Sequence, residues 1–300
     1  MEQLFTVLLI ALPALVLLTL LVSLLIVLHF AYPKRDTLEN ELNKKRDEPL
    51  FEYGENAAFE EFCVTAEDGV RLSARLFPYH EESRKFVILC HGLSVNQICA
   101  SRYIEPYKEA GFNIITYDHR GHGGSERAVC TLSRKESRDL LAVIAYVRKR
   151  FGEDAYIGVQ GESMGGATVI GSLRYRPEIR FAVADCPYAT LDGFVEHFFR
   201  TRHLPVFLYR TAGLLSKLIF GFGYSEIRPI DGINNSDVPL LLFHGLNDRT
   251  IPHTESEKII AEYKGPGELV LVEGADHAQN IAVDRAAYNA KVKEFIGRAE

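Results

Sequence analysis

Short apolar segments alternate with stretches of helical character along most of this 300-residue chain. The apolar segments are FVILC (86–90), NIITYD (113–118), AYIGVQ (155–160), FAVAD (181–185), PLLLFHG (239–245) and ELVLVEG (268–274). Segments of this length and composition are typical of parallel strands that are buried on both faces, with helices as the crossover connections. Together with a hairpin around Asp68 and Gly69, the pattern predicts an α/β fold with a doubly wound, mostly parallel sheet for residues 51–300.

The pentapeptide Gly161-Glu162-Ser163-Met164-Gly165 directly follows the segment AYIGVQ and opens a helical stretch. In the pattern G-x-S-x-G, a tight turn between strand and helix forces the serine into strained backbone geometry, and the flanking glycines relieve the crowding. The alternative is a serine that merely caps a helix. The strand-turn-helix context favours Ser163 as a nucleophile.

A serine hydroxyl needs an adjacent base that a third group holds in place. His277 follows the segment ELVLVEG, and Asp248 follows the segment PLLLFHG, so both lie beyond the carboxyl ends of predicted strands. The order serine, acid, histidine is the one found with the G-x-S-x-G turn. Asp185 and Asp276 are alternative acids. The motif HGLND followed by Ile-Pro favours Asp248 as the acid and His277 as the general base.

The loop His91-Gly92-Leu93 follows the first predicted parallel strand. A backbone N–H in such a loop, together with the N–H that follows the nucleophile, forms the oxyanion hole of acyl-transfer enzymes. We therefore expect the N–H groups of Leu93 and Met164 to stabilise the negative charge on the acyl oxygen. For His91, ordering of the loop is favoured over proton transfer.

The motifs HGLS, DHRGHGGS, GESMGG, HGLNDRTIP and GADH resemble those of the α/β-hydrolase superfamily. The resemblance covers residues 57–298 and is strongest to membrane-anchored bacterial serine hydrolases that are similar to monoacylglycerol lipase-like and Bem46-like proteins. It implies that Asp118, Arg120 and residues 121–125 form a structural loop beside the site. The extended HGGG oxyanion motif of some esterases is not present in the sequence.

Residues 188–230 interrupt the alternation of strands and helices with a long segment that is rich in aromatic side chains. An insertion of this length in a compact domain is typically a lid or a binding cap. We predict a helical cap here, with Phe198 and Phe199 as substrate-binding residues. The alternative is that its aromatic side chains form only the core of the cap.

Residues 4–31 carry no formal charge and are mostly Leu, Val, Ile and Ala. About 20 apolar residues suffice to span a bilayer, so we predict a single transmembrane helix. A cleaved signal peptide is the alternative, but it has a basic segment at its start and a shorter apolar run. Residues 32–50 mix acidic and basic side chains in equal number, which indicates a solvated juxtamembrane linker.

Basic side chains follow the predicted span and none precedes it. Because Lys and Arg are enriched on the cytoplasmic side of a membrane, the pattern predicts a cytoplasmic catalytic domain. Export of the soluble domain is the alternative. The five cysteines form no C-x-x-C pair and are predicted to be free thiols, which suits a reducing compartment.

These features predict a serine hydrolase that cleaves a carboxylic ester or thioester of an apolar acyl group through an acyl-serine intermediate. The expected partners are a small-molecule acyl ester or lipid substrate and the membrane, with no metal and no cofactor. The net charge of −6 excludes a basic surface for nucleic acid. Two alternatives stay open, a serine peptidase similar to proline iminopeptidases and a catalytically silent scaffold tethered to the membrane.

Overall fold

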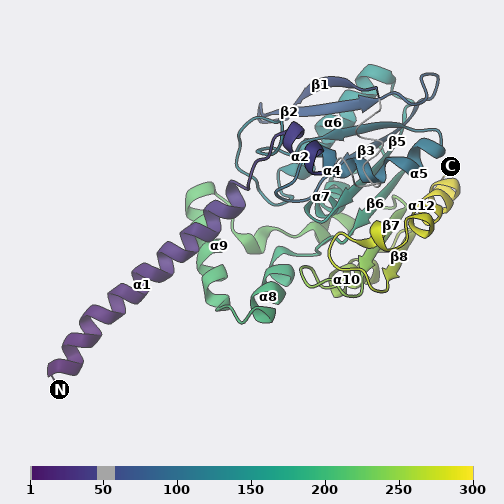
Figure 1. Cartoon of the computed structure of the whole chain (residues 1–300). Coiled ribbons are helices and arrows are strands. Elements are labelled where there is room, and N and C mark those ends of the chain that lie inside the picture. Colours follow the sequence, from purple (N-terminus) through teal and green to yellow (C-terminus); the bar gives the residue numbers. More distant parts are fainter. Residues whose placement is uncertain (1, 46–57, 300) are drawn as a thin grey trace.

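One eight-stranded sheet forms the centre of the computed structural model, which describes residues 2–45 and 58–299 (Figure 1). The strand order is β1-β2-β4-β3-β5-β6-β7-β8. β2 pairs antiparallel with β1 and β4, and all other pairs are parallel. The bounds are β1 Glu60–Thr65, β2 Arg71–Phe77, β3 Lys85–Cys90, β4 Asn113–Tyr117, β5 Tyr156–Glu162, β6 Phe181–Asp185, β7 Leu240–Gly245 and β8 Gly267–Val272. The predicted doubly wound, mostly parallel sheet is confirmed.

Helices cover both faces of the sheet. The bounds are α4 Gln97–Ala100, α5 Ile104–Glu109, α6 Glu136–Phe151, α7 Met164–Ser172, α8 Leu191–Thr201, α9 Val206–Phe220, α10 Thr254–Glu262, α11 Asn280–Val283 and α12 Arg285–Ala299. Short 3₁₀ helices span η2 Ser101–Tyr103, η3 Leu173–Tyr175, η4 Tyr224–Glu226 and η5 Pro229–Ile233. α6, α7 and α10 pack on one face of the sheet, and α5 and α12 pack on the other.

The central strand β3 is covered by helices on both faces, which explains why residues 86–90 are all apolar. Phe86, Ile88 and Cys90 point into the layer that contains α6, while Val87 and Leu89 point into the layer that contains α12. Because successive side chains of a strand lie on opposite faces, a strand covered on both sides has no polar alternation. The parallel strands β5, β6, β7 and β8 are neighbours, so the loops that follow them meet at one edge of the sheet.

Helices α8 and α9, with η4 and η5, occupy the interval between β6 and β7 that corresponds to the predicted cap. Thr190 caps the start of α8, because its hydroxyl oxygen accepts a hydrogen bond from the N–H of Gly193 (3.0 Å). α9 ends at Gly221, which has a positive φ of 79°. The two helices lie at one side of the sheet domain, and α9 lies beside the N-terminal helix (Figure 1).

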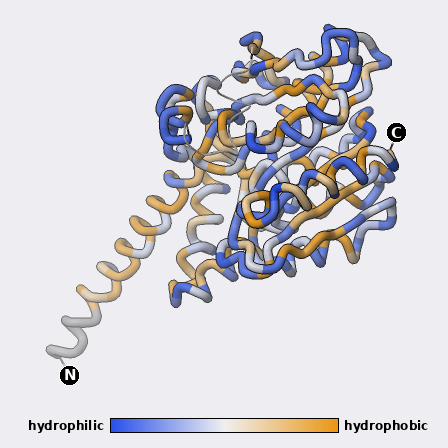
Figure 2. The backbone as a smooth tube through the Cα atoms, turned by 45° about the vertical axis from the view of Figure 1, so that its right-hand side comes forward, coloured by the Kyte–Doolittle hydropathy of each residue, from blue (hydrophilic) through white to orange (hydrophobic). Residues whose placement is uncertain are grey.

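The N-terminal helix α1, Glu2–Ala31, extends away from the rest of the chain as a long rod (Figure 1). Its segment Leu9–Ala31 reaches a mean hydropathy of 2.9, and Figure 2 shows this apolar character along the exposed part of the rod. The segment is long and apolar enough to cross a membrane. Length and composition of this kind also occur in signal sequences.

The last turns of α1 pack against the cap. Ser23, Val27 and Ala31 are buried at helical spacing, and the Ser23 hydroxyl donates to the carbonyl oxygen of Leu208 in α9 (3.1 Å). The N–H of Cys130 donates to the carbonyl oxygen of Ala31 (2.9 Å). The same apolar cluster therefore contains residues of α1 and of the cap.

The charged segment after α1 is docked on the sheet domain, which differs from the predicted solvated linker. The Arg35 guanidinium donates to the carbonyl oxygens of Gly123 and Ser125 at 2.6 Å each. A short helix, α2 Leu38–Lys45, packs against α4 and buries Glu41, which accepts a hydrogen bond from the Cys99 thiol (3.2 Å). Residues 46–50 of the predicted linker lie outside the described residues.

Candidate active site

Ser163 occupies a sharp turn between β5 and α7, with φ 54° and ψ −117°. This left-handed region is strained for a residue with a side chain. A Cβ atom on Gly161 would lie 2.2 Å from the carbonyl oxygen of Gly165, and one on Gly165 would lie 2.3 Å from that of Cys90. Glycine is therefore required on both sides of Ser163, as the motif predicts.

Three residues from the loops after β5, β7 and β8 form one hydrogen-bonded chain. The Ser163 hydroxyl lies 2.9 Å from His277 Nε2, and His277 Nδ1 lies 2.7 Å from Asp248 Oδ2. The carboxylate accepts the Nδ1 proton, so Nε2 is free to accept the proton of the serine. The structure thus brings together the three residues that the sequence singles out.

The electrostatic environment favours an ionised Asp248 carboxylate and raises the basicity of the His277 imidazole. Burial opposes ionisation of Asp248, but hydrogen bonds from His244 and His277 outweigh it and hold the pKa of the carboxyl below its usual range. Burial likewise disfavours the charged form of His277, yet the hydrogen bond to Asp248 and its negative charge raise the pKa of the imidazole above its ordinary value. Asp248 is therefore placed to stabilise a positively charged His277 imidazolium.

His244 is a second histidine beside the acid, and sequence reasoning missed it. Its Nε2 donates to the carbonyl oxygen of Ile251 (2.9 Å) and lies 3.3 Å from Asp248 Oδ2. Its Nδ1 lies 2.7 Å from the Ser256 hydroxyl. The only sequence signal for it is its place in the motif HGLND, four residues before the acid.

The two alternative acids have other partners. Asp185 is buried and accepts hydrogen bonds from Asn280 Nδ2 (2.6 Å) and from the Tyr103 hydroxyl (3.3 Å). Asp276 accepts from the backbone N–H of His277 (2.8 Å) and pairs with Arg249. Among the acidic residues that the structure describes, only Asp248 is hydrogen-bonded to the His277 ring.

The predicted oxyanion donors lie on either side of Ser163. Met164 is the first residue of α7, where a backbone N–H has no partner within its helix. A Cβ atom on Gly92 would lie 3.6 Å from the Cβ of Ser163, at van der Waals contact, so the loop that carries Leu93 lies beside Ser163. In the described part of the chain, the N–H groups of Leu93 and Met164 donate to no protein acceptor. Both are therefore available to a ligand.

Three buried histidines hold the loop that carries Leu93. His91 Nδ1 donates to the carbonyl oxygen of Gly92 (2.6 Å), and its Nε2 accepts from the N–H of His119 (3.0 Å). His122 Nε2 accepts from the N–H of Ser94 (3.3 Å). Burial lowers the pKa of His91 and of His122 to about 4, so both rings are neutral and can act as acceptors. His91 orders the loop, as expected. Its ring nitrogens are hydrogen-bonded to Gly92 and His119, and not to the Ser163 hydroxyl.

An ion pair lies behind Ser163, and no local motif signals it. Arg102, from η2, pairs with Glu162, the residue before Ser163, and Glu162 also accepts from the Tyr103 hydroxyl (2.6 Å). Arg102 Nη1 donates to the carbonyl oxygen of Ala278, the residue after His277 (2.9 Å). One guanidinium therefore joins the serine turn to the histidine loop.

The structure places the two predicted substrate-binding phenylalanines differently. Phe199 is only 6% exposed and packs in the apolar cluster between the cap and α1. Phe198 is half-buried, contacts Phe194 edge to face, and carries the Arg202 guanidinium 3.7 Å from its ring centre. Phe199 thus has the environment of a core residue, because it faces α9, where its ring centre lies 6.1 Å from that of Tyr209.

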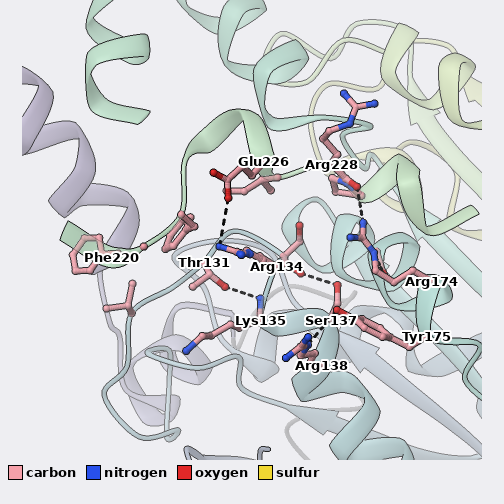
Figure 3. A pocket seen from close by; sticks show the side chains of 17 residues that line it. Thr131, Arg134, Lys135, Ser137, Arg138, Arg174, Tyr175, Phe220, Glu226 and Arg228 are labelled. Carbon is pink, nitrogen blue, oxygen red and sulfur yellow. Dashed lines mark hydrogen bonds and ion pairs between the residues drawn. The ribbon is translucent and has the colours of Figure 1, made fainter. Parts of the chain in front are cut away.

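A cavity of about 580 Å³ lies between α6 and the end of the cap (Figure 3). Its lining includes Arg134, Arg174 and Arg228. None of the hydrogen-bonded residues Ser163, His277 and Asp248 lines it. Arg134 lies 3.9 Å from Glu226, and Arg174 donates to the carbonyl oxygen of Arg228 (2.7 Å). This cavity is separate from the serine and does not define the acyl site.

Cys186, Asp248 and His277 have donor atoms within 4.8 Å of one another. Burial raises the pKa of the Cys186 thiol well above its ordinary value, so the thiolate that a metal ion requires is disfavoured. The Asp248 and His277 atoms are already hydrogen-bonded to each other. The chemistry of this group therefore fits acid-base catalysis better than metal binding.

The strand order and the serine turn after β5 define the class of protein. The sequence matches the family described as serine aminopeptidase, S33, over residues 81–219. With the structural similarities given below, the chain is a member of the α/β-hydrolase superfamily.

Among its relatives, the protein YqkD of Bacillus subtilis is 27% identical over 269 residues, which cover 88% of each chain. The protein YfhR of Escherichia coli K12 is 26% identical over 245 residues, covering 77% of this chain and 78% of that protein. Among solved structures, the esterase Pf2001 of Pyrococcus furiosus is 27% identical, with a TM-score of 0.70 over 90% of this chain and 97% of that chain. A puromycin-hydrolyzing peptidase of Mycobacterium tuberculosis shares the fold at 20% identity, with a TM-score of 0.65 over 81% of this chain and 40% of that chain.

Proposed function

We propose that the protein is a serine hydrolase that cleaves carboxylic esters or thioesters of apolar acyl groups through an acyl-serine intermediate. The observation that carries the proposal is the hydrogen-bonded chain from Ser163 through His277 to Asp248. Ser163 Oγ attacks the acyl carbonyl while His277 Nε2 takes its proton, and the N–H groups of Leu93 and Met164 stabilise the oxyanion. His277 then protonates the leaving group. Water, activated in the same way, releases the carboxylic acid and restores the serine.

Ester cleavage is favoured over aminopeptidase activity, although the matching family is described as a serine aminopeptidase. An aminopeptidase needs a free carboxylate to bind the substrate amine. The cap carboxylates already have partners: Asp192 accepts from the Tyr209 hydroxyl (2.6 Å), Glu196 pairs with Arg210, and Glu226 pairs with Lys217. The Pyrococcus furiosus protein, which is similar over nearly the whole chain, is an esterase.

The apolar side chains around the proposed oxyanion donors favour an apolar acyl group as substrate. Met164 and Leu93 belong to the same apolar cluster as Phe194 and Phe198 of the cap. Burial of each methylene of an acyl chain against such a surface contributes about 0.8 kcal/mol. The cluster thus extends from the serine toward the cap, where an acyl chain finds apolar partners.

Rates on p-nitrophenyl esters from acetyl to palmitoyl test this proposal. We expect kcat/KM to rise with acyl length, and Phe198→Ala to lower it roughly tenfold more for octanoyl than for acetyl, because the longer chain loses an apolar contact. Phe199→Ala is the matched control. It should destabilise the fold by about 3–5 kcal/mol without changing chain-length preference, since Phe199 lies in the core. Equal losses on both esters in Phe198→Ala would assign Phe198 a structural role only.

We also propose that α1 is a retained membrane anchor and that the hydrolase domain lies in the cytoplasm. Retention is supported by the burial of Ser23, Val27 and Ala31 against the cap, because removal of α1 would expose that cluster. Orientation follows from the basic side chains after the span.

Thiol labelling in intact cells tests the orientation. In a Cys63→Ser background, which removes the exposed native thiol, Glu39→Cys places a reactive thiol on the surface of α2. We expect a membrane-impermeant maleimide to label it only after lysis. Labelling of intact cells would place the domain outside.

A further inference from the structure

An exposed apolar stripe runs along α9 of the cap. Phe207, Leu214 and Leu218 are 53%, 61% and 73% exposed. Their spacing of seven and four residues puts them on one face of the helix, with Thr211 between them. Exposed contiguous apolar surface of this kind marks a site of interaction with a protein or a membrane.

The stripe is continuous with the apolar surface of α1. The two helices pack side by side and run in the same direction, because Ser23 contacts Leu208 near the start of α9 and Tyr32 contacts Phe220 at its end (Figures 1 and 2). Leu25 and Leu28 of α1 are exposed at the same level as the stripe. A surface that covers one of these helices therefore extends over the other.

We propose that α9 lies in the boundary between the headgroups and the acyl chains of the bilayer that α1 spans, with the α9 stripe facing the lipid. This inference rests on the proposed role of α1 as a membrane anchor. The occupant of the stripe is the lipid bilayer, because the stripe continues from a helix whose own exposed surface is apolar from Leu9 to Leu21.

The depth of α9 follows from its contacts with α1. Leu20 is the middle of the apolar segment Leu9–Ala31, and Ser23 and Tyr32 lie three and twelve residues beyond it, which corresponds to roughly 5 and 18 Å along the helix axis. If Leu20 lies near the middle of a hydrocarbon core of about 30 Å, α9 begins inside the core beside Ser23 and passes its boundary before Phe220, which lies beside Tyr32. The stripe residues Leu214 and Leu218 lie between these two levels, near the boundary.

The charges around the stripe suit such a boundary. Arg200, Arg210 and Lys217 are more than half exposed, and Arg202 lies in the turn between α8 and α9. Glu196 and Glu226 pair with three of these four basic groups, which leaves a net positive charge around α9. Lys217 lies in the last turn of α9, where a long basic side chain reaches anionic headgroups while its methylene groups lie along apolar surface.

Docking of this kind gives the proposed hydrolase direct access to lipid substrates. The cap shares one apolar cluster with Met164, which is next to Ser163. An acyl chain that leaves the bilayer beside α9 therefore meets apolar side chains of the cap on its way to the serine.

Tryptophan fluorescence in the full-length protein reconstituted into liposomes tests the inference. The chain contains no Trp, so each introduced Trp reports one position alone. Leu214→Trp and Leu218→Trp probe the stripe, Leu15→Trp probes the span, and Val283→Trp is the control at an exposed position of α11 far from α1 in the sheet domain. Emission is compared in liposomes of dioleoyl phosphatidylcholine and of its brominated analogue.

We expect brominated lipid to lower the emission of both stripe variants by about twofold or more, and to leave Val283→Trp unchanged. If Leu15→Trp is quenched while the stripe variants behave like Val283→Trp, the docking of α9 is overturned and the anchor stands. If the Trp emission of the stripe variants is blue-shifted but not quenched by brominated lipid, a second copy of the chain covers the stripe. That result also overturns the proposal. If Leu15→Trp is not quenched, both the anchor and the docking fall.

Discussion

Ser163→Ala is expected to lower the rate of ester hydrolysis by about 10⁴-fold or more, because serine, histidine and acid act as one unit. The substitution removes the atom that attacks the acyl carbonyl and leaves the turn intact. Loss of one hydroxyl hydrogen bond at 2.9 Å should change the thermal midpoint little. Initial rates on a p-nitrophenyl ester, with circular dichroism melts of both proteins, provide the measurement.

Covalent labelling with a fluorophosphonate gives an independent readout of the same prediction. The wild type should be labelled and Ser163→Ala should not, whereas Ser225→Ala, at an exposed cap serine, should label like the wild type. Near-wild-type hydrolysis by Ser163→Ala would refute the assignment of the nucleophile. A folded wild type that neither hydrolyses esters nor takes the label would support the scaffold alternative.

Asp248→Asn is expected to lower kcat by roughly 10⁴-fold, because an amide cannot hold His277 in the tautomer that accepts the serine proton. Asp185→Asn is the matched comparison and should lose far less. Asp185 accepts hydrogen bonds from Asn280 and Tyr103, and not from the His277 imidazole. The reverse ranking would move the acid role to Asp185.

The pH profile separates a catalytic role of Asp248 from a structural one. His277 acts as a base only when neutral, so kcat/KM falls as the pH drops through its pKa. The negative charge of Asp248 raises that pKa in the wild type. The residual activity of Asp248→Asn should therefore have its acid limb at lower pH than the wild type. An unchanged acid limb would show that Asp248 does not interact with His277 in solution.

Helix α1 and the cap form one structural unit in this chain. Val27 and Phe199, one from α1 and one from the cap, are buried in the same apolar cluster, and α2 and Arg35 fasten the following segment to the sheet domain. The domain is thus held at a defined angle to α1, which the proposed anchoring would keep close to the membrane. A long flexible tether would not impose such an orientation.

Features of the fold that depend on local patterns were correctly predicted from the sequence, and the positions of the candidate site residues follow from the same patterns. The six parallel strands follow from short apolar segments, because a strand buried on both faces leaves no other composition. The sharp turn at Ser163 follows from its two glycines and from the strand and helix that flank it. Asp248 and His277 follow from motifs directly after β7 and β8, since the fold brings the carboxyl ends of these strands to one edge.

Features that depend on contacts between distant segments were not predictable in this way. Arg102 and Glu162 are 60 positions apart in the chain and meet only because η2 lies over the end of β5. The charges of the segment after α1 indicate solvent, yet Glu41 is buried because Cys99 provides a donor in α4. The aromatic composition of the cap does not distinguish Phe198 from Phe199. Their different exposure arises because α9 packs against α8, where the Phe199 ring lies beside that of Tyr209.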